Sequence, residues 1–449
     1  MYWPGLFYVG DSFGYLDAAL NNPWPAFDPA HPGGYPLLLW LLAAPGGFRL
    51  AVVVIVQHAA GLATGALVYA LLVRLRVPPL AAAAASAVYL LASYPVVLEQ
   101  HVLSEPFFTL TLVGSAYLAV AGRDGRAFVA SGFLLGFAGL VRAVGLAATP
   151  ALLLYALWRR RAPRVAAAAA AAAAVPVLAF STAHALSGHG FGLSEWDGWI
   201  LYGRVAPIAD CAGADIPAGT AGVCESDAER ARKRREGWTP SAYIFNLGSP
   251  AHRVLGPELS PEANSTLRAF ALAIIRAHPA AYARMVVAET SAFFRPDRPL
   301  ALDPGVMLHE HDDDLQPIRE HPSVRRHVGE YRPRFRGPLD AVLWFDRNAR
   351  PPRPLLALLA LAPLAALAAA LAGRGRLRLP HLAETAFLFL VAAGLVLGAV
   401  GFAEENVRFL VPALPFFTAS AALAVADLAR AVSQGLTPST QIPHSSTTR

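Results

Sequence analysis

Residues 102–121 of the chain are VLSEPFFTLTLVGSAYLAVA. Glu105 is the one charged residue in this stretch, and it lies near the beginning. As an α-helix the stretch would rise about 1.5 Å per residue, which is enough to cross a hydrocarbon core of about 30 Å. The stretch therefore predicts a membrane-spanning helix with a carboxylate near its first turn.

Similar apolar stretches occur on both sides of this one. We expect further spans at 50–73, 79–98, 127–146, 164–186, 353–373, 382–402 and 407–430. The segment 147–158 is too short to cross alone, so we expect a bent pair with 127–146, broken near Gly139 and Gly145. The 449 residues are 55% hydrophobic and 15% charged, whereas soluble domains carry about 25% charged residues. The chain is predicted to be an all-α polytopic membrane protein.

The charged residues are concentrated in one part of the chain. More than half of them lie between residues 187 and 350. We expect an extracytoplasmic loop with a juxtamembrane helix, a first set of transmembrane helices, an extracytoplasmic domain of mixed structure, a second set of transmembrane helices and a disordered cytoplasmic tail. These five parts are assigned to residues 1–49, 50–186, 187–352, 353–430 and 431–449.

Arginines in the short loops predict the orientation in the membrane. They occur at Arg74 and Arg76, Arg123 and Arg126, Arg159 to Arg164, and Arg374 to Arg378. Cytoplasmic loops are enriched in Arg and Lys, and these loops fall on alternate connections, so one topology satisfies them all. The first loop then lies outside, with no signal peptide at Met1, and we expect a further helix upstream of residue 1.

The net charge and the cysteines restrict the function further. The charge of +6 comes from arginines, since Lys233 is the only lysine, and we attribute it to the ends of spans and not to nucleic-acid binding. Two cysteines are too few for a zinc ribbon or an iron–sulfur cluster. Cys211 and Cys224 both lie in the segment placed outside, an oxidising compartment, which predicts a disulfide between them.

Ionisable groups beside a membrane span are costly and indicate function. Four motifs contain such groups at the predicted outer ends of the spans, and Arg142 adds a fifth position. The motifs are GDSFGYLD at 10–17, HPGGYP at 31–36, LSEP at 103–106 and EENVRF at 404–409. The charges therefore converge on one face of the membrane, beside the large polar segment.

In this order the motifs resemble the polyprenyl-phosphate-sugar-dependent integral membrane glycosyltransferases of the GT-C fold, near the protein O-mannosyltransferase and aminoarabinose-transferase group. The resemblance covers residues 10 to 186 and 353 to 430. It implies a GT-C-like helical bundle in which Asp11 is the catalytic base or positions the acceptor. The chain has Ser12 after Asp11, where the commoner motif of the family is an Asp-Glu pair.

The resemblance also implies the substrates. The donor would be a sugar linked to polyprenyl phosphate, and a glycan, lipid or protein would accept it at the extracytoplasmic face of the cell membrane. Asp11 would take the proton of the attacking hydroxyl, and the displacement would invert the anomeric carbon. We expect Arg142 and Arg408 to hold the phosphate and Glu105 to orient an arginine or the acceptor. The other expected substrate-binding residues are Tyr15, His31 and Arg204.

Each of these residues also has a structural interpretation. Asp11 could cap a short helix, and Glu105 could complement a helix dipole. Both arginines could reach lipid head groups, and Arg408 could instead pair with Glu404 or Glu405. Next to Arg204, the rings of Trp196, Trp199 and Tyr202 could stack on a sugar or anchor the segment at the membrane interface.

No cofactor is expected, and the need for a divalent metal stays open. The sequence from His309 to Asp314 resembles a hard-metal site, but we interpret it as a solvated acidic loop and predict no metal ligands. Two other functions compete with the glycosyltransferase, namely a transporter or flippase of a polar lipid and an inactive GT-C-like scaffold. Transporters usually contain internal repeats and charges at the bilayer centre, so charges at one face favour the enzyme.

Overall fold

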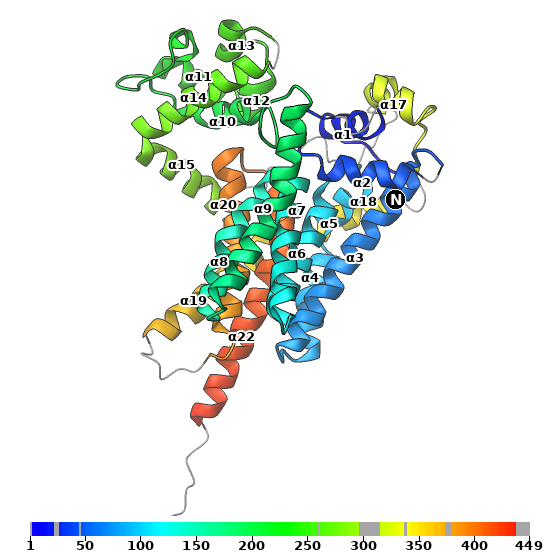
Figure 1. Ribbon diagram of the computed structural model, residues 1–449, viewed down its shortest axis with the longest axis vertical. Helices are drawn as coiled ribbons and strands as arrows, with labels where there is room; N and C mark the ends of the chain where they lie inside the picture. The colour runs from blue at the N-terminus through cyan, green and yellow to red at the C-terminus, as the bar shows by residue number, and fades with distance from the viewer. Residues whose placement is uncertain are drawn as a thin grey trace, which may run out of the picture.

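Figure 1 shows the computed structural model of the chain, a bundle of long helices with smaller helical parts at one end. The structure describes residues 2–21, 27–44, 46–257, 260–295, 315–335, 339–372 and 379–436. The arginines from Arg374 to Arg378, the loop from His309 to Asp314 and the end of the predicted tail, from residue 437, lie outside the described residues.

The bundle consists of apolar helices that follow the predicted spans. They are α3 (Leu50–Arg74), α4 (Pro79–Leu90), α5 (Ser93–Gln100), α6 (Glu105–Ala121), α7 (Gly125–Val141), α8 (Thr149–Trp158), α9 (Pro163–Leu186), α19 (Arg353–Ala372), α20 (Leu382–Phe402) and α22 (Leu414–Leu436). Among the described residues, five helices are long and apolar enough to cross a membrane, and up to seven if bent pairs count as single spans. The fold is the predicted all-α polytopic membrane protein.

Two of the predicted spans are interrupted. The 79–98 span is bent by 49° where α4 meets α5. In the 127–146 span, α7 ends at Val141, Arg142 is extended, and the 3₁₀ helix η1 (Ala143–Ala148) leads into α8. The bent pair expected from the sequence is therefore present, and its break falls at Arg142, between the two glycines to which we assigned it.

The arginine loops predicted to share one side meet at one end of the bundle. A cavity of about 790 Å³ at this end is lined by Arg74, Arg123 and the run from Arg159 to Arg161. The guanidinium of Arg430, near the end of α22, donates to the carbonyl of Arg76 at the same end. Three of the four predicted arginine loops therefore lie at the same end of the bundle, and the fourth, from Arg374 to Arg378, falls outside the described residues.

A separate helical domain lies at the opposite end of the bundle, in green in Figure 1. Its helices are α10 (Asp197–Val205), α11 (Asp227–Arg235), α12 (Pro240–Phe245), α13 (Pro250–Leu255), α14 (Pro261–Ala277) and α15 (Pro279–Ala292). The side chains of Trp199, Tyr202 and Phe270 are buried in its own apolar core. The rings of Trp199 and Tyr202 are therefore not exposed to stack on a sugar or to anchor at a membrane interface.

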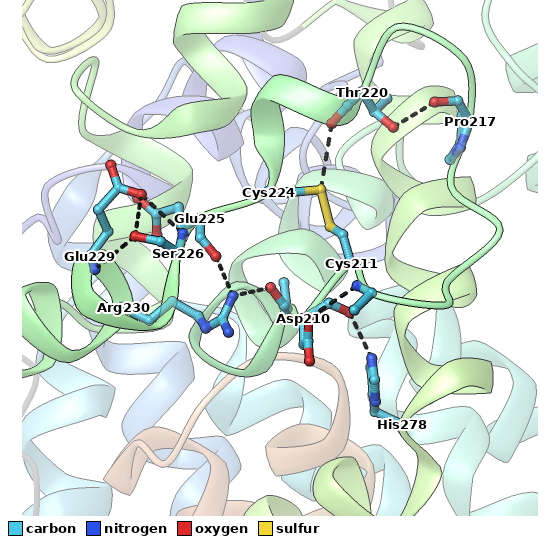
Figure 2. Close-up of a disulfide and its surroundings, with 12 residues drawn as sticks. Asp210, Cys211, Pro217, Thr220, Cys224, Glu225, Ser226, Glu229, Arg230 and His278 are labelled. Atoms are coloured by element: carbon cyan, nitrogen blue, oxygen red, sulfur yellow. Dashed lines mark hydrogen bonds between the residues drawn. A yellow bond between two sulfur atoms is a disulfide. The ribbon is translucent and has the colours of Figure 1, made fainter.

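The predicted disulfide between Cys211 and Cys224 is confirmed, with Cα atoms 6.0 Å apart. Figure 2 shows that hydrogen bonds support both ends of the loop it closes. The guanidinium of Arg230 donates to the carbonyls of Ala209 and Glu225, one residue or two from each cysteine. These hydrogen bonds and the disulfide therefore hold the same two chain segments together.

The remaining elements are short and come from the first 43 residues and from residues 316–348. The helices are α1 (Asp11–Leu20), α2 (Gly34–Ala43), α16 (Gln316–Glu320), α17 (Pro322–His327) and α18 (Leu339–Asn348), and the two-residue strands β1 (Tyr2–Trp3) and β2 (Arg334–Phe335) pair antiparallel. The hydroxyl of Ser323 donates to Asp17 at 2.7 Å, and the ring of His321 stacks on Phe13. Chain segments about 300 residues apart therefore pack together around α1.

Replacing both cysteines, in the variant Cys211→Ser/Cys224→Ser, should lower the free energy of unfolding by about 3 kcal/mol, because a bridge over 13 residues restricts the unfolded chain. Thermal unfolding followed by tryptophan fluorescence should show the loss, since Trp199 is in the core of this domain. Reduced wild-type protein is the matched control. An unchanged melting temperature, or two free thiols in non-reduced protein by mass spectrometry, would contradict the assignment.

Candidate active site

The first residues of the chain place α1 beside the N-terminal end of α6. The amide of Leu6 donates to the carbonyl of Gln100 at 2.9 Å, and the amide of Val102 donates to Leu6 at 3.0 Å. The buried hydroxyl of Ser12 donates to the carbonyl of Val102 at 2.7 Å and accepts from the amide of Tyr8 at 2.8 Å. Ser12, where the commoner motif has a glutamate, therefore fixes α1 to the turn before α6.

Two glycines of the sequence motifs allow this arrangement. Gly10 precedes α1 with a φ of 111°, a conformation that favours glycine, and Asp11 is the first residue of the helix. At Gly34 a Cβ atom would lie 2.7 Å from the carbonyl carbon and oxygen of Leu140. The HPGGYP motif thus lets α2 pack directly against the end of α7, next to Arg142.

The centre of the site is an ion-pair network around Arg408. This residue lies on the short helix α21 (Val407–Leu410), which begins with the Asn406 side chain accepting from the Arg408 amide at 3.0 Å. Its Nε donates to Glu105 Oε1 and its Nη2 to Asp11 Oδ2, both at 2.7 Å. The guanidinium carbon also lies 4.4 Å from the ring centroid of Tyr8. Arg408 therefore connects the first and last parts of the chain.

Arg142 approaches the same carboxylate from the other side. Its Nη1 lies 2.9 Å from Glu105 Oε1 and donates to the hydroxyl of Ser104 at 3.1 Å. Ser104 is also 3.1 Å from the hydroxyl of Tyr15. The side chain of Glu105 is 1% exposed and that of Arg142 is 15% exposed, whereas that of Arg408 is 7% exposed. Both guanidinium groups thus contact one buried oxygen, and Arg142 is the more accessible of the two.

His31 completes the site on the side of Asp11. Its Nε2 lies 3.4 Å from Asp11 Oδ1, and its Nδ1 contacts Asp28 Oδ2. The ring packs on that of Tyr15, with centroids 4.6 Å apart. Asp28 is held in turn by the amide of Ala30, which donates to its other oxygen at 2.9 Å. One imidazole therefore lies between two carboxylates.

These contacts determine the protonation states of Asp11 and His31, which are both partly exposed. Burial alone would raise the pKa of the Asp11 carboxyl, but Arg408 and His31 outweigh it and hold that pKa far below its usual range. Burial alone would lower the pKa of His31, but the hydrogen bonds and charges of Asp11 and Asp28 raise it to about 9. At neutral pH, Asp11 is therefore a carboxylate and His31 an imidazolium.

Six of the seven residues that we predicted to bind substrate or catalyse lie together in this site. They are Asp11, Tyr15, His31, Glu105, Arg142 and Arg408. Arg204 is not among them, because it is fully buried in the separate helical domain, where it donates to Glu289 at 2.6 Å. Glu404 accepts from the hydroxyl of Ser241 at 2.9 Å and so connects the helical domain to the end of α20.

Three contributors to the site were not identified in the sequence. Ser104 was quoted in the LSEP motif, but a lone serine gives no signal of its role. Asp28 lies three residues before His31 and is followed by a proline. This pattern is typical of an Asx-type turn, which would bring the Asp28 carboxylate near His31. Tyr8 belongs to an aromatic segment with no periodicity. A cluster of three side chains that could bind a metal ion lies outside this site. It consists of His184, His189 and Glu195.

Comparison with known proteins supports the resemblance. Residues 30–185 match the model of a family described as dolichyl-phosphate-mannose-protein mannosyltransferase. No curated protein and no solved structure matches the chain. The matched range contains His31, Glu105 and Arg142, whereas Asp11 and Arg408 lie outside it and reach the site through the fold. The match supports a membrane glycosyltransferase of the GT-C type.

The raised pKa of His31 predicts a pH dependence of stability. The protonated ring stabilises the folded protein fully below its unfolded pKa of about 6.5, and this contribution of up to about 3 kcal/mol is lost as the pH rises through about 9. The melting temperature of wild type should therefore exceed that of His31→Gln most at about pH 6 and least at about pH 10. A difference that stays constant or grows over this range would contradict the assignment.

Proposed function

We propose that the protein transfers a sugar from a polyprenyl-phosphate donor to an extracytoplasmic acceptor, with inversion at the anomeric carbon. The observation that carries this proposal is Asp11, an ionised carboxylate held between Arg408 and His31 whose side chain is still 26% exposed. The site lies at the end of the bundle opposite the arginine cavity, next to the outer domain. By the arginine rule that end faces outward.

Asp11 would bind the hydroxyl of the acceptor and take its proton. With its pKa so low, Asp11 is a weak base before reaction. The hydroxyl becomes strongly acidic only when its oxygen has largely bonded to the anomeric carbon, so a weak base is sufficient if the proton leaves late. His31 keeps one oxygen of Asp11 oriented and Arg408 the other, so the carboxylate is positioned before the acceptor binds.

Arg142 and Arg408 would have different tasks toward the donor. Arg408 is almost fully buried and is bonded to two carboxylates, so its main role is to position Asp11. Arg142 is more exposed and shares its one carboxylate partner with Arg408, which leaves donors available for a phosphate. A planar guanidinium suits phosphate oxygens, and it would stabilise the charge that grows on the departing lipid phosphate.

Binding of the donor phosphate would also change the basicity of Asp11. Its negative charge would partly offset the positive charge of Arg408 beside Asp11 and so raise the pKa of that carboxyl toward its usual value. Asp11 would then be a better base with the donor bound than without it. This coupling favours transfer to the acceptor only after the donor is in place.

Replacing Asp11 by Asn should abolish sugar transfer and leave donor binding nearly unchanged, because the amide has the same shape but cannot take a proton. Transfer should be measured with a panel of labelled polyprenyl-phosphate sugars, mannose first, and purified full-length protein. Asp17→Asn on the same helix is the matched control, since the Asp17 carboxylate accepts from Ser323 and lies 3.5 Å from His327 Nε2, apart from the ion-pair network around Arg408. Transfer by Asp11→Asn at the wild-type rate would exclude Asp11 as the base.

Replacing Arg142 by Gln should weaken donor binding by about 10- to 150-fold, the equivalent of one charge-assisted hydrogen bond of about 1.5–3 kcal/mol. Arg142→Lys should recover only part of it, because the planar geometry is lost. Arg408→Gln should instead lower kcat more than donor affinity, since it releases Asp11.

The control for these variants is Arg268→Gln, which removes an arginine that pairs with Asp197 on the outer domain. Donor binding is measured directly with a labelled donor, and kcat and KM are measured with the best donor of the panel. Unchanged donor binding in Arg142→Gln would exclude this residue from the phosphate site. Equal losses of donor affinity in the Arg142 and Arg408 variants would contradict the division of tasks.

A further inference from the structure

A second group of polar side chains lies at the C-terminal end of α9. α9 ends at Leu186, and the chain then folds back, so that His189 and Glu195 return to His184 in the last turn of the helix. One nitrogen of each histidine and one carboxylate oxygen all lie within 4.8 Å of one another. None of the three has a role in the ion-pair network around Arg408.

His184 has the arrangement of a metal ligand. It is fully buried, and its Nδ1 donates to the carbonyl of Gly190 at 2.6 Å. This bond leaves the lone pair on Nε2, which has no hydrogen-bond partner among the described residues. A buried acceptor without a partner is costly. Metal-bound histidines usually donate their other ring nitrogen to a carbonyl or carboxylate in this way.

The other two side chains are held at a suitable spacing. His189 Nδ1 lies 3.3 Å from Glu195 Oε2, while Glu195 Oε1 accepts from the amide of Gly190 at 2.9 Å. Two atoms bound at about 2.0–2.1 Å to a tetrahedral zinc ion lie about 3.3 Å apart, which the His189 and Glu195 atoms match. The rings of His184 and His189 are stacked, with centroids 4.5 Å apart, and would turn toward a shared ion when it binds. The ring of Phe27 packs edge-on against both imidazoles, with centroids 5.1 and 5.7 Å away, and forms an apolar wall.

We propose that His184, His189 and Glu195 form a zinc site, with water as the fourth ligand. Two imidazole nitrogens and one carboxylate oxygen suit zinc and do not suit magnesium or calcium, which prefer oxygen ligands. The ion would give the Nε2 lone pair of His184 the partner that it lacks. This inference concerns the metal alone and is independent of whether the protein transfers a sugar.

The position of the zinc site also gives it a structural role. The amide of Glu195 donates to the carbonyl of Pro29 at 2.7 Å. The hydroxyl of Ser194 donates to the carbonyl of Ala30 at 3.0 Å. These two carbonyls lie between Asp28 and His31, the carboxylate–imidazole pair that contacts Asp11. A metal that fixes Glu195 to α9 therefore also fixes the loop that presents His31.

The test uses the full chain, purified in detergent through an affinity tag without histidines. Protein treated with EDTA is dialysed against Zn²⁺, and bound metal is counted by mass spectrometry. We expect about one zinc per chain, and binding of Co²⁺ with the visible absorption of a tetrahedral complex. Zinc should raise the melting temperature of the EDTA-treated protein.

The variants His189→Gln and Glu195→Gln should bind zinc at least about tenfold more weakly and lose the stabilisation by zinc. His278→Gln is the matched control, because this partly exposed histidine donates to the carbonyl of Asp210 in the helical domain, away from the cluster. His189 is chosen because it is partly exposed, whereas replacing the buried His184 could prevent folding. No retained zinc in wild type, or equal zinc binding in all variants, would overturn the proposal and leave an ordinary hydrogen-bonded cluster.

Discussion

The arrangement of the candidate active site depends on the ion pairs of the buried Glu105 carboxylate. One of its oxygens contacts both Arg142 and Arg408 in a place that is almost free of solvent. Charges are costly to bury, and each needs partners of opposite sign in good geometry. The three charges therefore stabilise one another only together, and they join the end of α7, the start of α6 and the helix α21. Removing one partner would leave the others buried and unpaired, a loss of about 3–5 kcal/mol.

The charge balance of the site determines what it can bind. Asp11, Asp28 and Glu105 supply three negative charges, and His31, Arg142 and Arg408 supply three positive charges. A neutral site does not attract a phosphate by net charge, so recognition depends on which cations are accessible and which are already bonded. Arg142 is accessible and Arg408 is not. A lipid-linked phosphate would therefore bind at one side of the network, and Asp11 is presented at the other.

Much of this was predictable from the sequence, because the membrane imposes strong rules on composition. Apolar length predicted the helices of the bundle, arginine loops predicted which ends lie together, and the cost of charges near spans indicated Asp11, Glu105, Arg142 and Arg408. The pairing of Asp11 with Arg408, 397 residues apart, could not be predicted, since nothing in one sequence shows which helices are neighbours. Arg204 was placed with the site because aromatic residues flank it, but those rings form the core of the helical domain.

The four charged residues of the network share a position that explains why they can meet. Asp11 and Glu105 are the first residues of α1 and α6, Arg142 follows the last residue of α7, and Arg408 lies in a helix of four residues. A side chain in the middle of a long span points sideways into lipid or neighbouring helices, whereas one at a helix end can point along the axis into a space shared by several ends. Irregular backbone at membrane depth is tolerated where protein or a polar cavity surrounds it. The interruption of α7 at Arg142 and the short helix at Arg408 are therefore not defects of otherwise regular spans, because they are what brings two guanidinium groups to one carboxylate.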